Sequence, residues 1–486
     1  MNDFRSAMAR LHEWGGFLIG WFVFAIALSG SLAVFRPEIS QWMRPELTDM
    51  KSDPLHATEA GIAWLQTHAA SAPAWYLTIT EKRAPYIEAL YFNGTRYVER
   101  ALDPTTGSPD TIRDTMGGDF FYRFHFELQL PHPFGRLISA SCGLAIVLAL
   151  ITGVIIHKRI FADFFTLRFY KGQRSWLDFH NITSVVALPF HFIIAFSGAV
   201  TLWAQILPAS LLTVYPHNIM KYYADLDPVT EPLPPKHHKA PLAPIAPMLQ
   251  EAEKRFGPDG IAQVLIYNPN DSASIVIIKS GNGQHIGYDT HTLRFSGNNG
   301  QIILEQQEKR PIVRAFSLIY GLHIARFSNF LTRWFYFFSG ILLALATASG
   351  LHLWVIRKKR TQKDTFSFKM VERLNIAILI GLPISFALFF VANRLIPLHP
   401  HSLFTLSRSD MEIDTVFLSL FLFMALCFFM ETTQSKKILS LIGCISFIYI
   451  IIIGNTLDNI INFSTSCVSL LFFITYVFIY KSVRSS

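Results

Sequence analysis

Long apolar stretches recur along the whole chain, and each approaches the roughly 20 residues that an α-helix needs to cross a bilayer. These stretches cover residues 14–35, 136–157, 182–207, 332–356, 374–396, 415–430, 438–454 and 461–480. The composition agrees, because only 16% of the residues are charged, against about 25% in an average soluble domain. The sequence therefore predicts a polytopic all-α membrane protein with about eight transmembrane helices.

The basic residues lie beside the ends of these stretches rather than in stripes with aromatic residues. The formal net charge of +8 is therefore explained by membrane lipid as the partner, and nucleic acid is not expected. Basic residues gather in alternate connections, at Arg168 to Arg174, Arg357 to Arg373 and Lys436 to Lys437. By the positive-inside rule, this distribution predicts that both termini lie in the cytoplasm.

Two long polar segments, residues 36–134 and 208–331, then fall on the opposite side of the membrane. Each indicates a small α+β domain, with a helix-like stretch followed by a strand meander. The remaining parts are the first transmembrane region, a pair of helices joined by a basic cytoplasmic loop, the fourth helix and a C-terminal extension of four helices. These parts cover residues 1–35, 135–207, 332–360 and 371–486.

The chain contains an internal repeat of helix, inserted domain and returning helix. His12 is followed seventeen residues later by Ser29 and Gly30, and His180 is followed at the same spacing by Ser197 and Gly198.

The returning helices repeat as well. His125 precedes Arg136 and the segment L-A-L-I-T-G, while His323 precedes Arg333 and L-A-L-A-T-A-S-G. Each repeat therefore carries one histidine near either face of the membrane. The extension from Leu374 has no counterpart in the repeat.

Histidines repeated at membrane depth require a chemical reason, because ionisable residues there are costly and usually functional. Two neutral imidazoles on opposite sides of a macrocycle would hold a haem b. The repeat predicts two such haems, with the axial ligand pairs His12–His180 and His125–His323. The alternative is that these histidines bind no cofactor and lie at the membrane interface.

A second ligand scheme uses His191, which lies eleven residues after His180 and on nearly the same helical face. His352 of the fourth helix is its possible partner. Arg136 and Arg333 are candidate contacts for haem propionates, as are Arg123 and Arg326, which flank His125 and His323. Snorkelling arginines at helix ends are the alternative interpretation.

The sequence holds no P-loop, no G-x-G-x-x-G opening a helix, no H-E-x-x-H and no G-x-S-x-G. A nucleotide-driven pump, a built-in flavin domain, a metalloprotease and a serine hydrolase therefore lack support. Any reductant must come from another molecule.

Three motifs resemble those of the PepSY-associated transmembrane family. They are R-L-H-E-W-G-G-F at residues 10–17, P-H-P-F-G-R at 131–136 and L-H-I-A-R-F at 322–327, and the resemblance covers about residues 5–360. It implies a protein of the bacterial inner membrane with two periplasmic PepSY-like domains. The family includes proteins of iron acquisition, some of them haem-containing ferric-siderophore reductases. Ala325 stands where the family has glycine, and the glycine that usually follows the third-helix histidine is missing.

The leading hypothesis is a di-haem protein that carries electrons to the periplasmic side and reduces a ferric chelate or siderophore. Its donor would be a cytoplasmic reductant or a quinone. A non-enzymatic PepSY-type regulatory or assembly protein that binds a protein partner is the alternative. A chelate permease is less favoured, because the apolar stretches offer few polar residues for an aqueous path.

Overall fold

The structure is a computed structural model. It describes residues 2–47, 53–80, 83–157, 166–216, 218–258, 260–281, 285–288, 290–399, 406–454 and 460–484. These residues form two compact units. The helical unit contains residues 1–43, 115–206 and 330–486, and the sheet unit contains residues 44–114 and 207–329.

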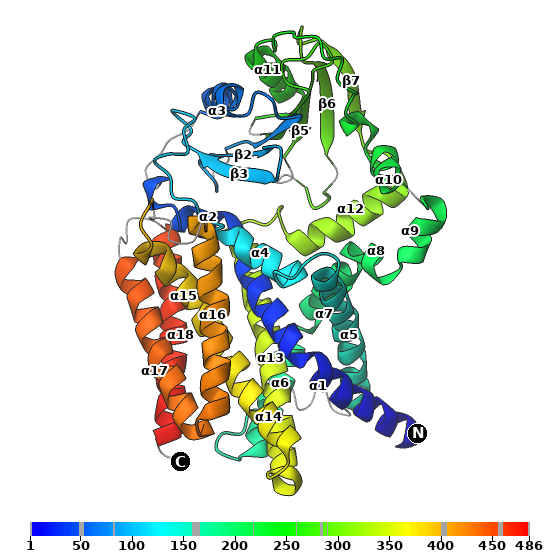
Figure 1. The fold of residues 1–486 in the computed structure, drawn as a ribbon. Helices are drawn as coiled ribbons and strands as arrows, with labels where there is room; N and C mark the ends of the chain where they lie inside the picture. Colours follow the sequence, from blue (N-terminus) through cyan, green and yellow to red (C-terminus); the bar gives the residue numbers. More distant parts are fainter. Residues whose placement is uncertain are drawn as a thin grey trace. The chain divides into compact units, whose positions relative to one another are not determined.

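The helical unit consists of helices only in its described part (Figure 1). The first half contains α1 (Asn2–Ala33), α2 (Arg36–Trp42), α4 (Gly118–Glu127), α5 (Phe134–Ile156), α6 (Gln173–Val186), α7 (Leu188–Thr201), α8 (Trp203–Ile206) and α13 (Phe330–Gln362). The C-terminal extension contains α14 (Phe366–Asn375), a π-helical stretch (Ile376–Ile380), α15 (Gly381–Leu395), α16 (Arg408–Phe429), α17 (Thr432–Ile453) and α18 (Ile460–Arg484).

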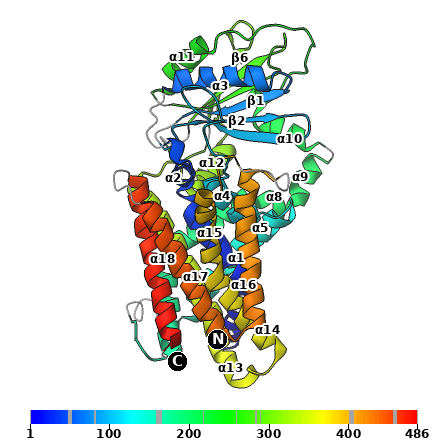
Figure 2. The ribbon, with the colours of Figure 1, turned by 60° about the vertical axis from the view of Figure 1, so that its left-hand side comes forward.

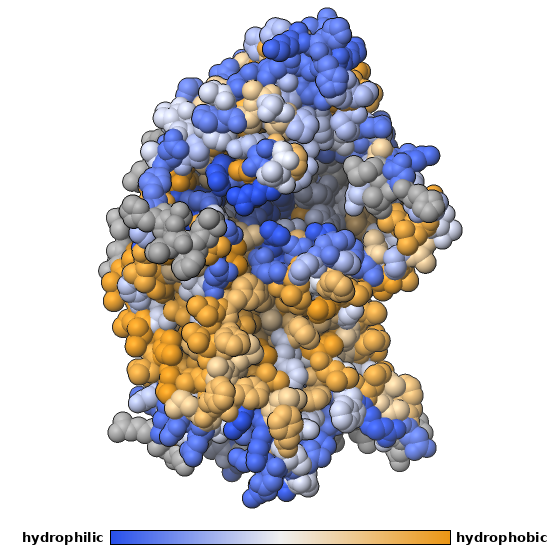
Figure 3. Space-filling view, viewed as in Figure 1, coloured by the Kyte–Doolittle hydropathy of each residue, from blue (hydrophilic) through white to orange (hydrophobic). Residues whose placement is uncertain are grey.

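Seven of the described helical segments are long and apolar enough to cross a membrane, or eight when the bent pair α6–α7 is counted as one span. The chain is therefore a multi-pass membrane protein, as the sequence predicts. Figure 3 shows apolar side chains as a broad band over these helices. Both termini lie at the same end of the helical unit (Figures 1 and 2), which agrees with an even number of spans.

The third predicted span differs from the expectation, because residues 182–207 do not form one continuous helix. Helix α6 ends at Val186, α7 begins at Leu188, and the two axes differ by 68°. Pro189 explains the break, since it has no N–H to donate and its ring clashes with the carbonyl four residues earlier. His180 and His191 therefore belong to different helices, and the expectation that they share one helical face is wrong.

The returning helices form the centre of the repeat. Helix α1 packs against both α5 and α13, α6 packs against α13, and α7 packs against α5. The extension packs mainly on itself, with α15 against α16 and α17, and α17 against α18.

The sheet unit is built from both inserted segments. The first segment contains a 3-10 turn (Pro45–Leu47), α3 (Pro54–His68), β1 (Ala74–Thr78), β2 (Ile87–Phe92) and β3 (Tyr97–Leu102). The second contains α9 (Pro208–Val214), α10 (Ile219–Leu226), a 3-10 turn (Pro228–Thr230), α11 (Ile245–Phe256), β4 (Ile261–Tyr267), β5 (Ile275–Ser280), β6 (His291–Ser296), β7 (Ile302–Gln307) and α12 (Pro311–Ile324).

The strands of the two segments form one antiparallel sheet in the order β3-β2-β1-β4-β5-β6-β7. The joint is the β1–β4 pair, in which Tyr76 lies opposite Leu265. The sequence indicates α3, α11 and the first five strands, but it places the sixth strand before His291 and treats the segments as two separate domains at 36–134 and 208–331. The structure joins their strands, and α2 and α4 belong to the helical unit.

Helices α3 and α11 cover the sheet (Figure 2) and share one core with it. Trp75 is fully buried there and donates its indole N–H to Ala69 O at 2.8 Å. Apolar side chains from both inserted segments, such as Leu65 and Met248, are buried in this core. Burial therefore stabilises the joined sheet rather than either segment alone.

Candidate functional site

Two of the predicted ligand histidines lie close together inside the helical unit. His12 of α1 and His180 of α6 have ring centres 6.3 Å apart, with ring planes at 80°. The sequence pairs these residues through the repeat alone, and the structure brings them together.

Each of these imidazoles is held by a backbone carbonyl of a returning helix. Nδ1 of His12 lies 3.0 Å from Ala149 O in α5, and Nδ1 of His180 lies 2.8 Å from Ala346 O in α13. A carbonyl oxygen can only accept, so Nδ1 carries the hydrogen in both rings. In a neutral imidazole, Nε2 is then unprotonated and able to bind a metal.

A hydroxyl and a glycine complete each half of the site. Thr152 Oγ1 lies 3.1 Å from His12 Nδ1, and Ser349 Oγ lies 3.2 Å from His180 Nδ1. The next residue is Gly153 or Gly350, where a Cβ atom would lie 3.4 Å or 3.3 Å from the Cε1 atom of the imidazole. Larger side chains at these positions would therefore push the rings away.

Sequence reasoning did not assign these supporting residues, although a signal is present. Residues 149–153 and 346–350 share the pattern A-x-x-[ST]-G in the returning helices. The alanine carbonyls and the hydroxyls of these two segments are the groups that contact the imidazoles.

The pair fits a metal bound between two imidazoles. A bond from a metal ion to an imidazole nitrogen is roughly 2 Å long, so two rings on opposite sides of one ion have centres roughly 6 Å apart. No group of three or more His, Cys, Asp or Glu residues suited to a metal ion occurs in the described residues. Two ligands suffice for a haem, because the macrocycle supplies the others. A Cβ atom at Gly15 or Gly16 would meet nothing within 4 Å, which leaves room beside His12.

His125 of α4 repeats this mode of support in the same unit. Its Nδ1 lies 2.8 Å from Ile26 O of α1, so Nε2 is again the unprotonated nitrogen. Gly30 is required next to it, because a Cβ atom there would lie 2.5 Å from Nδ1. Burial lowers the pKa of His125, which favours the neutral ring that metal binding needs.

His323, the predicted partner of His125, lies in the last turn of α12 and belongs to the sheet unit. The two units are described separately, and the His125–His323 pair stays a prediction. Ala325 ends α12 in the left-handed conformation, with φ of 53°. A glycine is the usual residue at such a position.

The candidate propionate ligands are paired with carboxylates. Arg136 and Arg123 both contact the buried Glu127, with Nε atoms 3.2 Å and 2.9 Å from its oxygens. Arg333 Nη1 lies 3.6 Å from Glu38 Oε1. The guanidinium of Arg326 lies 5.2 Å above the ring of Tyr288. Each of these arginines thus has a partner within its own unit, and a role toward propionates stays a prediction.

The second ligand scheme has a different geometry. His191 is buried and its Nε2 lies 3.0 Å from Ser339 O, so Nε2 carries the hydrogen. His352 packs edge-on against Trp176, with ring centres 4.5 Å apart. His191 would have to bind a metal through Nδ1, unlike His12, His180 and His125.

Comparison with known proteins identifies the repeat region. The family model described as the PepSY-associated TM region matches residues 9–357. An uncharacterised protein of Pseudomonas aeruginosa is 25% identical over 295 residues, which covers 57% of this chain and 73% of the relative. The match ends before α14, so the extension lies outside the family model.

Proposed function

This chain belongs to the family of the PepSY-associated TM region, and we propose that it is a di-haem electron-transfer protein of the bacterial inner membrane. In this proposal it passes electrons to the periplasmic side, where a ferric chelate such as a siderophore is reduced. The resemblance to iron-acquisition proteins supplies the substrate class.

The observation that carries the proposal is the symmetric support of His12 and His180. Two halves of a repeat present two imidazoles 6.3 Å apart, each with Nδ1 bound to a backbone carbonyl and Nε2 available. Interfacial histidines need neither this shared Nδ1–carbonyl contact nor glycines beside their rings.

The chain's own residues then have defined roles. Nε2 of His12 and of His180 would be the axial ligands of one haem b, and His125 with His323 would be those of the second. The carbonyls of Ala149 and Ala346 fix the ring orientation and raise the basicity of the ligating nitrogen. A bound haem supplies one-electron redox chemistry.

Helix α1 links the two positions. It carries His12 itself, and fourteen residues later its Ile26 carbonyl holds His125. Fourteen residues span roughly 21 Å of helix axis and almost four full turns. The two positions therefore lie along similar faces of one helix, within a hydrocarbon core that is about 30 Å thick.

Reduction would release the iron because hard oxygen donors hold Fe(III) much more strongly than Fe(II). The two inserted segments would provide the periplasmic surface on which the chelate docks. Both would lie on the side opposite the cytoplasmic termini.

An absorption spectrum of the full-length protein, purified from haem-replete cells, tests the proposal. We expect a Soret band that shifts when dithionite is added, and sharp α and β bands in the reduced state. A colourless preparation defeats the proposal.

Activity is tested separately with reduced protein in liposomes and an external ferric siderophore, with Fe(II) trapped by a chromogenic chelator. His125→Ala should abolish Fe(II) formation, and His352→Ala should leave it unchanged. Equal rates in both variants would count against His125 as a haem ligand.

A protein-binding function is the second candidate, and the edge strand β7 favours it. Ile303 and Leu304 of this strand are 55% and 44% exposed. An exposed apolar edge can pair with a strand of another chain. Ile303→Lys should abolish capture of such a partner while leaving the absorption spectrum unchanged.

A further inference from the structure

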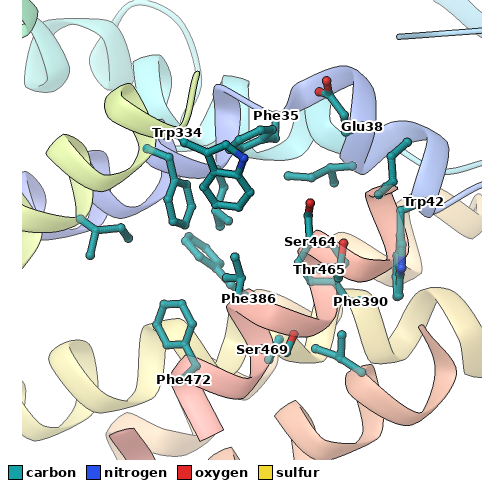
Figure 4. Close-up of a pocket in the computed structure, with 18 of the residues that line it drawn as sticks. Phe35, Glu38, Trp42, Trp334, Phe386, Phe390, Ser464, Thr465, Ser469 and Phe472 are labelled. Atoms are coloured by element: carbon teal, nitrogen blue, oxygen red, sulfur yellow. The ribbon is translucent and has the colours of Figure 1, made fainter. Parts of the chain in front are cut away.

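A cavity of about 180 Å³ lies in the helical unit where the family-matched repeat meets the C-terminal extension. Its walls come from α1, α2 and α13 on one side, and from α15, α17 and α18 on the other (Figure 4). Neither half of the molecule forms this cavity alone.

Aromatic rings form much of the lining. Phe35 and Trp334 belong to the repeat, with ring centres 4.8 Å apart, while Phe386 and Phe390 come from α15 of the extension. Flat apolar walls of this kind favour a ligand that is itself a flat ring.

Polar groups interrupt the lining on two sides. Glu38 and Arg333 form an ion pair whose side chains are only 17% and 13% exposed. Helix α18 contributes the hydroxyls of Ser464, Thr465 and Ser469 (Figure 4). Polar side chains are expensive in a membrane protein's interior and therefore indicate a ligand with oxygen substituents.

We propose that this cavity binds the ring of an isoprenoid quinone or quinol. The ring is flat and apolar, and its oxygens would accept from the α18 hydroxyls and the Arg333 guanidinium or, in the quinol, donate to Glu38. A cavity of about 150 Å³ holds one benzene molecule, so the volume fits one substituted ring and excludes a whole phospholipid. Helix α18 is the least buried of the candidate spans, so the isoprenoid tail has a way out to the lipid along it.

The cavity is connected to the His125 position through packed aromatic side chains. Phe121 and Phe124 lie on α4, one turn before His125 and directly before it. They contact Phe390 and Phe386, with ring centres 5.6 Å and 5.2 Å apart. Aromatic side chains that line the cavity are therefore in contact with α4, the helix that carries His125.

An electron-donating role for this ligand rests on the proposed function. One quinol would break its two O–H bonds, release two protons and lose two electrons. Two ferric chelates would each gain one electron, and the quinol would become the quinone. Glu38 is the carboxylate of the lining that can accept a departing proton first. The electrons of the quinol would then pass to the haem proposed at His125.

Binding is tested with the full chain in nanodiscs of defined phospholipid and with decylubiquinone as the probe. Trp42 and Trp334 line the cavity, so bound quinone should quench tryptophan fluorescence saturably. Ser464→Phe fills the cavity and should weaken binding by roughly tenfold or more. Ser464→Ala removes only a hydroxyl and should weaken it by roughly fivefold.

Cys467→Phe is the matched control, because Cys467 is exposed on the same helix and does not line the cavity. Its affinity should equal that of the wild type. Absence of saturable quenching in the wild type overturns the proposal, and so does equal binding by wild type, Ser464→Ala and Ser464→Phe. Displacement of the probe by added phospholipid alone would also overturn it, in favour of a lipid-chain site.

The same titration with a His12→Ala, His125→Ala double variant separates the two proposals. Quinone binding should persist in this variant, so failure of the haem proposal leaves the cavity test intact. If haem is present, decylubiquinol should reduce wild type and Ser464→Phe at different rates. Equal rates would show that electrons enter elsewhere.

Discussion

The two halves of the repeat present their histidines in the same way although the helices that carry them differ. His12 lies in the continuous helix α1, whereas His180 lies in α6, which ends six residues later and bends by 68° into α7. Despite this difference, both Nδ1 atoms contact an alanine carbonyl and a hydroxyl of a returning helix.

The comparison shows that the returning helices determine the imidazole orientation. Helices α5 and α13 are unbroken through their A-x-x-[ST]-G segments, and both pack on α1. A break in a carrying helix is tolerated when the supporting helix is intact. Changes to the imidazoles, to their supporting residues and to the proline at the break would show whether the halves are equivalent.

Removal of either imidazole should have the largest effect. His12→Ala and His180→Ala each delete one proposed haem ligand and should each remove about one of the two proposed haems. The haem-to-protein ratio from the pyridine haemochromogen assay measures this loss. His191→Ala is the control and should retain both haems; loss of haem in that variant alone would favour the second ligand scheme.

Side chains at the supporting glycines should have the next largest effect. Gly153→Leu and Gly350→Leu place atoms against Cε1 of the imidazole and should reduce haem at the affected site by more than about half. Alanine at either position adds only a tight contact, so both alanine variants should retain most of the haem. A difference between the two leucine variants would break the equivalence of the halves.

Loss of the supporting hydroxyls should have a smaller effect, because the carbonyl contact remains. Thr152→Val and Ser349→Ala should each weaken haem retention by roughly tenfold. Haem transfer from each variant to apomyoglobin gives the rates to compare. Unchanged rates in both variants would assign the orientation to the carbonyls alone.

Replacement of the proline at the break should have the smallest effect. Pro189→Ala should lower the free energy of unfolding by less than about 1 kcal/mol, because proline in the first turn of α7 restricts the unfolded chain. Thermal unfolding measures the change, and haem content should stay at the wild-type value. A loss of haem would show that the bend itself positions His180.

The sequence predicts seven continuous spans and the proximity of His12 and His180 for physical reasons. Apolar stretches of bilayer length are independent of the rest of the chain, and the repeat identifies His12 and His180 as equivalent positions. The break before Leu188 follows from Pro189, whose effect on a helix does not show in the hydropathy of the stretch. The opposite tautomer of His191 depends on the position of Ser339 O and could not be predicted from spacing.

Other features depend on contacts between distant segments. Pairing of β1 with β4 needs the register of two strands separated by transmembrane helices, which hydrophobic patterns do not provide. The cavity lining combines α1, α2 and α13 with a C-terminal extension that lies outside the repeat. Aromatic residues such as Phe386 look like ordinary lipid-facing side chains until their neighbours are known.

The β1–β4 joint also sets an order of events during synthesis. Strand β1 ends at Thr78, and its partner β4 begins at Ile261, after α5, α6 and α7. At about 5–20 residues per second, the ribosome needs roughly 10–40 s to produce this interval. During that time the edge of β1 that later pairs with β4 has no partner strand. A completed sheet therefore indicates that α5, α6 and α7, which lie between its two halves in the sequence, have been inserted with the correct topology.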